Sequence, residues 1–390
     1  MLRIDRYNIN IKQGAVMKLN NLIFKSDDPQ SLHKLLGIVI ALAFSIWGMI
    51  LRFKAFANRE LWVDEIIQIK MTLEPLKPLW LREDGALDIT SFPGDYLLTY
   101  PLVKLFGVSK WVTIPHVIVT LLGFYLLYML CRHYFRTAFG YLVAFVLLCF
   151  NDILIFHALE IRPYSVLPTL ALACFYFTKD VIARKDGNNR QNFFVIILFV
   201  ITILFHPFGV SIAFFVLLFH ILNQSKEESL SDVMRRNAKF IGIISAIVII
   251  PWIYFVVGIM LVPPLEQEVF RYVPNPVSES SLSKSHNAPA YLVFSGYLAN
   301  HLIGLRSLYF LLLGIVATLI ISHQDRYRQI IYFFTLIAFP ILCVLILDIT
   351  IDYWFLPRQY IWVIPLFCFF LGWCWDSVIY SFYERSSYFR

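Results

Sequence analysis

The stretch LLGIVIALAFSIWGMILRFKAF, residues 35–56, decides the fold class, and the motif LWVDE, residues 61–65, follows it after a short connection. An apolar run of this length is typical of a helix that crosses a lipid bilayer. The motif ends in two adjacent carboxylates, Asp64 and Glu65, and opens a mainly acidic loop that continues to Asp95. Such a pair fits a general base, a metal site or ordinary solvated residues, so the pair alone does not choose among these roles.

The composition of the whole chain is that of a polytopic membrane protein. Of its 390 residues, 59% are hydrophobic and 15% are charged, and the mean hydropathy is +0.69. These values lie outside the range of soluble globular domains. The net charge of +7 is best explained by loop topology, and no nucleic-acid partner is expected because no basic run alternates with aromatic residues. The six cysteines lie in or beside apolar segments, so neither a disulfide framework nor a metal site is expected from them.

Apolar runs bounded by charge or proline recur along the chain and predict an all-α membrane protein with about ten transmembrane helices. These runs cover residues 35–56, 112–130, 139–156, 164–178, 192–206, 208–222, 240–262, 302–321, 330–348 and 359–379. Residues 96–106 are a further apolar piece, but a helix of this length reaches only about 16 Å across a core about 30 Å thick. We expect this piece to be interfacial or re-entrant. A helix from Trp62 to Thr72 is also expected to lie along the bilayer surface.

The spans divide the chain into a membrane domain and two tails. We expect residues 1–34 and 381–390 to be cytoplasmic tails and residues 35–380 to form one membrane domain. Within this domain, residues 57–95 are the first outer loop, with interfacial helices and the candidate catalytic residues. Residues 263–301 are a second outer loop, expected to be mobile because it is rich in proline and serine.

The distribution of basic residues predicts the orientation. By the positive-inside rule, the loops that carry most of them face the cytoplasm. Outside the N-terminal tail these residues are Arg132, Arg136, Lys179, Arg184, Lys185, Arg190, Lys226, Arg235, Arg236, Lys239, Arg326, Arg328, Arg385 and Arg390. The remaining loops then face outward, and they carry every unusual polar motif of the chain. This convergence was not used to set the orientation, so it independently indicates a site at the outer face.

Two arginines stand at outward ends of predicted spans. Arg162 lies in EIRPY, residues 160–164, where a proline suits the first helical turn and the guanidinium suits a phosphate or carboxylate. Arg358 precedes Tyr360 in a similar arrangement. Interfacial anchoring is the alternative explanation for both arginine–tyrosine pairs. His206 lies at another outward span end. It fits a metal ligand, a hydrogen-bond donor to a phosphate, or a hydrogen-bonded packing residue.

Four motifs taken together resemble the GT-C superfamily of glycosyltransferases, which use polyprenyl-phosphate-linked sugars. They are WVDE at 62–65, ALEIRPYS at 158–165, HPFG at 206–209 and RQY at 358–360. The resemblance is to the bacterial group related to protein O-mannosyltransferases and to the aminoarabinose and galacturonic acid transferases of lipopolysaccharide. It covers most of the chain in order and topology, and the Glu-x-Arg-Pro-Tyr piece is its most specific part. Where the family often has His-Pro-Pro-Leu-Tyr, this chain has FPGDY at 92–96.

The resemblance implies an activity, its substrates and a location. A sugar would move, with inversion, from a polyprenyl-phosphate donor to a lipid, glycan or protein acceptor. The site would face the periplasm from a multi-pass protein of the bacterial inner membrane, in contact with membrane lipids. No cofactor is implied, and the sequence leaves open whether a divalent metal takes part.

The resemblance also assigns roles within the site. Asp64 would be the general base, because the acceptor hydroxyl must lose its proton as it attacks. Arg162 and Arg358 would bind the donor phosphate and stabilise its growing charge as it departs. The implied site is completed by two supporting acids and three substrate contacts: Glu65, Glu160, Tyr164, His206 and Tyr360.

The alternative function is a polytopic transporter or a lipid or glycan flippase, since such proteins also place charges in cavities at membrane depth. The sequence shows no inverted repeat, and its polar motifs gather at one face instead of the midplane. Both features favour the transferase. A purely structural scaffold leaves the clustered arginines unexplained.

The predicted orientation can be tested by cysteine labelling. Single cysteines placed in residues 263–301 should react with a membrane-impermeant maleimide added from outside, because that loop is expected to face outward. Cysteines placed in residues 223–238 should react only after the membrane is permeabilised. The reverse pattern would contradict the orientation and would separate the candidate site from periplasmic substrates.

Overall fold

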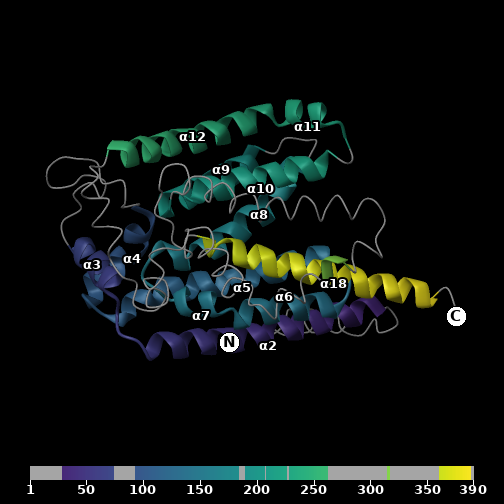
Figure 1. Cartoon of the computed structure of the whole chain (residues 1–390), viewed down its shortest axis with the longest axis horizontal. Coiled ribbons are helices and arrows are strands. Elements are labelled where there is room, and N and C mark those ends of the chain that lie inside the picture. Colours follow the sequence, from purple (N-terminus) through teal and green to yellow (C-terminus); the bar gives the residue numbers. More distant parts are fainter. Residues whose placement is uncertain are drawn as a thin grey trace, which may run out of the picture.

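The computed structural model describes residues 29–73, 93–183, 189–206, 208–225, 228–261, 314–316 and 360–387. Every regular element within these ranges is a helix, which confirms the all-α prediction. The α-helices are α2 (Pro29–Ala57), α3 (Val63–Leu73), α4 (Pro93–Phe106), α5 (Ile114–Tyr134), α6 (Ala138–Phe150), α7 (Asp152–His157), α8 (Leu167–Ala183), α9 (Asn189–Phe205), α10 (Phe208–Gln224), α11 (Leu230–Arg236), α12 (Ala238–Leu261) and α18 (Val363–Ser387). Two short 3₁₀ helices, η1 (Lys110–Thr113) and η2 (Pro163–Ser165), precede α5 and α8. The long helices run along one direction, and α3 and α4 gather at one end (Figure 1).

Three helical segments in the described ranges are long and apolar enough to cross a membrane: Ser31–Ala57, Lys110–Tyr134 and Val363–Tyr383. They coincide with the first, second and last predicted spans, and they identify a membrane protein. The predicted spans 164–178, 192–206, 208–222 and 240–262 also fold as helices, namely α8, α9, α10 and α12. The predicted spans 302–321 and 330–348 and the loop 263–301 lie wholly or almost wholly outside the described residues.

The prediction of one helix over 139–156 is wrong, because the chain breaks at Asn151. Helix α6 ends at Phe150 and α7 begins at Asp152. The side chain of Asn151 accepts a hydrogen bond of 2.9 Å from the backbone N–H of Leu154, so it caps α7 in the manner typical of asparagine. The apolar piece 96–106, predicted to be interfacial or re-entrant, is part of helix α4, which starts at Pro93 and reaches about 21 Å, too short to span.

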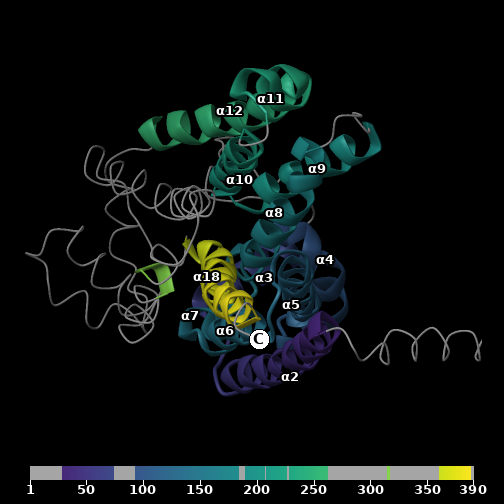
Figure 2. The same ribbon diagram turned by 90° about the vertical axis from the view of Figure 1, so that its right-hand side faces the viewer.

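Helix α18 is the centre of the bundle. It packs along α6 and also contacts α5 and α8, while α2 covers another side of α6 (Figure 2). Phe369 of α18 is fully buried and stacks on Phe135, with ring centroids 5.4 Å apart and planes within 6°. Its ring also lies 5.4 Å from Tyr134 and 6.0 Å from Phe175. Aromatic side chains bury a large apolar area each, so this cluster fixes α18 against the end of α5 and against α8.

A buried carboxylate links α18 to the start of α6. Asp376 is 3% exposed, and its oxygens accept hydrogen bonds from the backbone N–H groups of Arg136 and Thr137 and from the Thr137 hydroxyl. Arg136 and Thr137 directly precede α6, so the anion lies at the positive end of the helix dipole. The cost of burying the charge is thereby offset by several bonds to unpaired backbone donors.

Two glycines allow α6 and α18 to approach backbone to backbone. A Cβ atom added at Gly372 would lie 2.7 Å from the Gly140 carbonyl oxygen and 2.8 Å from the Ala144 Cβ atom. A Cβ added at Gly140 would lie 2.8 Å from the Cβ of Asp376. Small residues serve the same purpose at many helix interfaces in membranes.

Replacement of Gly372 by alanine should therefore destabilise the fold. We expect Gly372→Ala to lower the free energy of unfolding by about 1–3 kcal/mol, because the added methyl group has to push two helices apart. Thermal unfolding of the purified protein in detergent measures this change. Gly242→Ala is the matched control, since a Cβ there meets nothing within 4 Å. Equal melting temperatures for the two variants would contradict the close approach of α6 and α18.

Candidate functional site

The two carboxylates of the LWVDE motif occupy the first turn of α3 and have opposite environments. The expected helix at this point is confirmed. Side chains of adjacent helical residues point about 100° apart, so Asp64 and Glu65 diverge. The side chain of Glu65 is fully buried, whereas that of Asp64 is 33% exposed. Of the two, Asp64 is therefore the carboxylate that solvent or a ligand reaches.

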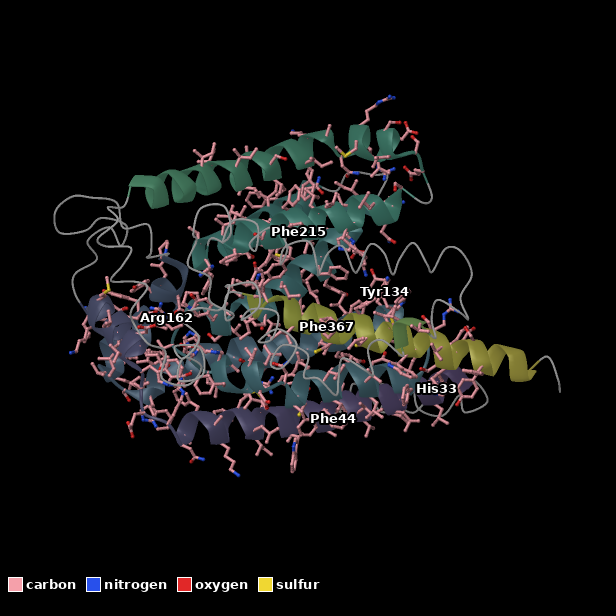
Figure 3. All side chains as sticks on the ribbon, in the orientation of Figure 1. His33, Phe44, Tyr134, Arg162, Phe215 and Phe367 are labelled. Carbon is pink, nitrogen blue, oxygen red and sulfur yellow. The ribbon has the colours of Figure 1, made fainter. Side chains whose placement is uncertain are left out.

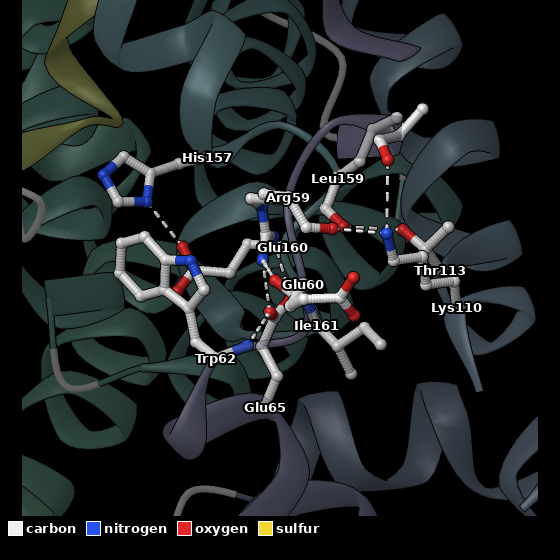
Figure 4. A network of polar contacts seen from close by, with 11 residues as sticks. Arg59, Glu60, Trp62, Glu65, Lys110, Thr113, His157, Leu159, Glu160 and Ile161 are labelled. Carbon is white, nitrogen blue, oxygen red and sulfur yellow. Dashed lines mark hydrogen bonds and ion pairs between the residues drawn. The ribbon is translucent and has the colours of Figure 1, made fainter. Parts of the chain in front are cut away.

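Glu65 is held by four hydrogen bonds (Figure 4). The Arg59 guanidinium donates from Nη1 to Oε2 at 2.5 Å and from Nη2 to Oε1 at 3.0 Å, a bidentate pair. The backbone N–H groups of Trp62 and Ile161 donate at 2.9 and 2.8 Å. Ile161 belongs to the loop before η2, so one carboxylate fastens α3 to a segment 96 residues further along the chain.

Arg59 is itself fixed by aromatic rings and by the end of α2. Its guanidinium carbon lies 4.9 Å from the ring centroid of Phe56, 5.5 Å from that of Trp62 and 5.9 Å from that of Phe156. The Lys110 ammonium donates to the backbone oxygen of Arg59. These contacts hold the cation in place, so that Glu65 meets a preorganised partner.

Arg162 lies opposite Asp64. Arg162 Nη2 is 3.9 Å from Asp64 Oδ2, and the two side chains are 26% and 33% exposed. This separation is longer than a hydrogen bond, so the two charges attract without being locked together. Arg162 Nε is buried and has no hydrogen-bond partner among the described residues. Figure 3 shows Arg162 at the α3–α4 end of the bundle, far from His33.

Glu160 is buried and belongs to the same loop. Its Oε2 lies 2.5 Å from Nδ1 of His157, and the His157 ring stands edge-on to that of Trp62, 6.3 Å away (Figure 4). Because Glu160 is only 1% exposed, it acts here within the protein, between α7 and η2. His157 was not anticipated as a member of the site, although its spacing of three residues from Glu160 permits this contact.

The three predicted substrate contacts lie in one row of rings. Tyr164 and His206 are 5.2 Å apart between centroids, His206 and Phe208 are stacked at 5.2 Å, and Phe208 is 5.9 Å from Tyr360. Tyr360 has no exposed surface and Tyr164 has 6%. His206 Nδ1 accepts the backbone N–H of Phe208 at 3.2 Å. In this structure the three side chains pack against one another and against Phe208, and Arg358 lies outside the described residues.

A second buried network braces α3 and was not anticipated. Asp95, fully buried at the start of α4, accepts a hydrogen bond from Gln68 of α3 and lies 3.0 Å from Nε2 of His116 in α5. Three helices are thereby connected at one carboxylate. The available sequence signal was His116, an ionisable residue inside the predicted span 112–130, where such residues are costly and specifically paired.

No group of three or more metal-binding side chains lies together among the residues that the structure describes. Comparison of the chain with protein-family models, with curated proteins and with solved structures finds no match. The function of the site is therefore argued from its residues and geometry.

Loss of the Arg59–Glu65 pair should be costly, because it leaves a buried carboxylate without its cation. We expect Arg59→Ala to lower the free energy of unfolding by about 3–5 kcal/mol. The double variant Arg59→Ala/Glu65→Gln should be more stable than Arg59→Ala, because its buried group is neutral. Thermal unfolding of both variants measures the difference.

Glu60→Ala is the control for this experiment, because it removes an exposed carboxylate next to Arg59. Its effect should stay within about 0.5 kcal/mol, as for most surface substitutions. An Arg59→Ala variant as stable as Glu60→Ala would show that the buried Arg59–Glu65 pair does not stabilise the fold.

Proposed function

We propose that this chain is an integral-membrane glycosyltransferase of the GT-C type. It transfers a sugar from a polyprenyl-phosphate donor to a lipid, glycan or protein acceptor, with inversion. The observation that carries the proposal is the pair of Asp64 and Arg162. The Asp64 carboxylate and the Arg162 guanidinium are both partly exposed and lie 3.9 Å apart. The segments that carry them are held together by the hydrogen bonds of Glu65.

Asp64 is the general base in this proposal. A base must lie within hydrogen-bond reach of the acceptor hydroxyl and must be held in position. The first turn of α3 provides that position, because Glu65 anchors it to Arg59 and Ile161. The exposed part of Asp64 is open to an acceptor that arrives from outside the bundle.

Arg162 stabilises the departing lipid phosphate. Negative charge grows on the leaving oxygen during transfer, and a fixed cation nearby lowers the energy of that state. The partial exposure of Arg162 and its loose contact with Asp64 leave the guanidinium available for phosphate oxygens. By the family resemblance, Arg358 is the second arginine that binds the donor phosphate. The scheme assigns no step to a cofactor.

The proposal includes the finer topology. About ten spans carry the chain across the bacterial inner membrane, both tails lie in the cytoplasm, and the Asp64–Arg162 face is periplasmic. The alternating basic loops support this arrangement. The short α3 and α4 suit an outer surface layer, because neither is long enough to span.

The decisive experiment is a transfer assay with a panel of polyprenyl-phosphate sugars in membranes that contain the full chain. Asp64→Asn should reduce turnover by about 10²–10⁴-fold, the usual scale for loss of a general base. Arg162→Ala should reduce turnover more than Arg162→Lys, because lysine keeps the positive charge and loses only the bidentate hydrogen-bonding geometry of the guanidinium. Melting temperatures should stay close to that of the unmodified protein, since neither side chain is deeply buried.

Glu60→Gln is the matched control, because it neutralises an exposed carboxylate four residues before Asp64 without touching the pair. It should leave turnover unchanged. Normal turnover in Asp64→Asn would move the base elsewhere. A chain that transfers no sugar from any donor, yet moves lipid between leaflets, would favour the flippase.

A further inference from the structure

Another arginine, Arg52, lies inside the bundle and lines a pocket that Tyr164 and Ser165 also border. Arg52 is on α2, five residues before the helix ends at Ala57, and is only 2% exposed. At the rise of an α-helix this is about 7.5 Å below the helix end. Arg52 therefore lies just beneath the outer end of a predicted span, where a charge is costly and by default indicates a function.

Arg52 has a structural role, because its side chain binds backbone carbonyls of two helices. Its guanidinium donates to the carbonyl oxygens of Gly48 at 2.9 Å, Leu148 at 3.0 Å and Cys149 at 3.5 Å. The last two belong to the final turn of α6, where carbonyls lack helical partners and the helix dipole is negative. The guanidinium carbon also lies 5.0 Å from the ring centroid of Phe124.

These contacts do not neutralise the cation. Arg52 forms no ion pair with a carboxylate in the described part of the chain, and its Nε has no hydrogen-bond partner there. A helix end supplies only about half an elementary charge. Within the part of the chain that the structure describes, this buried guanidinium is thus only partly compensated, and a bound anion would supply both the charge and the acceptor.

Arg52 lines a small, partly open pocket of about 40 Å³, which has room for a group of the size of a phosphate or a few water molecules. The pocket lies among α2, α5, α6, α7, α8 and the start of α18. Its polar lining includes Thr120, Ser165 and Thr169, and its apolar lining includes Leu154 and Leu172. At this size the pocket suits the anionic head of a molecule whose apolar part lies outside it.

Two hydroxyl groups of the pocket act as acceptors toward a ligand and therefore suit a part of it other than the anion. Thr120 donates to the Ala158 carbonyl at 3.1 Å, and Thr169 donates to the Val119 carbonyl at 2.9 Å. Their protons are therefore committed, and their oxygens present lone pairs. Such oxygens accept hydrogen bonds from hydroxyl groups that neighbour a phosphate, as on glycerol or a sugar.

We propose that this pocket is an anion site in which Arg52 binds a phosphate group. Two sources share that chemistry: the phosphate headgroup of a membrane lipid and the free phosphate ion. The depth of Arg52 and the apolar lining favour the lipid. The inference does not depend on glycosyl transfer, because it concerns binding, and a chain without transferase activity would still have this pocket.

The test measures ligand affinity of the full chain in detergent, by native mass spectrometry and thermal shift. Phosphatidic acid is the lipid phosphate probe, diacylglycerol is the same lipid without phosphate, and inorganic phosphate is the free ion. Phosphatidic acid should bind and raise the melting temperature, whereas diacylglycerol should not. Equal effects of the two lipids would overturn the proposal.

Arg52→Gln removes the charge but keeps hydrogen-bond donors for the α6 carbonyls. It should weaken binding of phosphatidic acid by at least about 10-fold, the scale of a lost charge-assisted hydrogen bond. Lys54→Gln is the matched control, because it removes an exposed charge two residues away on α2 and should leave binding unchanged. Equal binding of phosphatidic acid by these two variants would contradict the proposal and would leave Arg52 with only its structural role at the end of α6.

Ala158→Leu provides an independent variant if Arg52→Gln does not fold. Ala158 lines the pocket, so a leucine there fills the space while Arg52 stays in place. It should weaken phosphatidic acid binding to a similar degree, and wild-type binding by a folded Ala158→Leu would overturn the proposal. Competition by inorganic phosphate at Arg52 would identify the free ion as a ligand, and binding of the lipid alone would identify the headgroup.

Discussion

The buried carboxylate of Glu65 is the constraint on which the arrangement of α3 and the loop before η2 depends. A buried charge is tolerated only when it is paired and hydrogen-bonded, and Glu65 meets that condition with Arg59 and the N–H groups of Trp62 and Ile161. These partners come from the end of α2, the start of α3 and the loop before η2. Satisfying one carboxylate therefore aligns three segments, and that alignment brings Arg162 opposite Asp64.

The same principle fixes α6 within the bundle. Arg52 of α2 binds the carbonyls of its last turn, and Asp376 of α18 binds the N–H groups just before its first turn. A cation at the C-terminus and an anion at the N-terminus both complement the helix dipole. Two buried charges from neighbouring helices thus hold α6 along its axis, while Gly140 and Gly372 set how closely α18 approaches it.

Several features of the site could be predicted because they depend on local patterns. The apolar runs place α2, α5 and α18, and the 100° step of a helix separates Asp64 from Glu65. The break at Asn151 was missed, because a single polar residue in a long apolar run gives a weak signal until its capping bond is seen. Tyr360 was expected to contact substrate, but its burial depends on how α18 packs.

The sequence by itself determined the all-α class and the positions of most of the described helices, and it supplied candidates for the site, because hydropathy, charge and helix-breaking residues act over short distances along the chain. Only the tertiary structure decided the partners: Arg59 and Ile161 for Glu65, Gln68 and His116 for Asp95, and the end of α6 for Arg52. A buried polar group takes whichever partner the packing of distant segments brings within hydrogen-bond distance. That proximity is a property of the assembled bundle, and no local pattern encodes it.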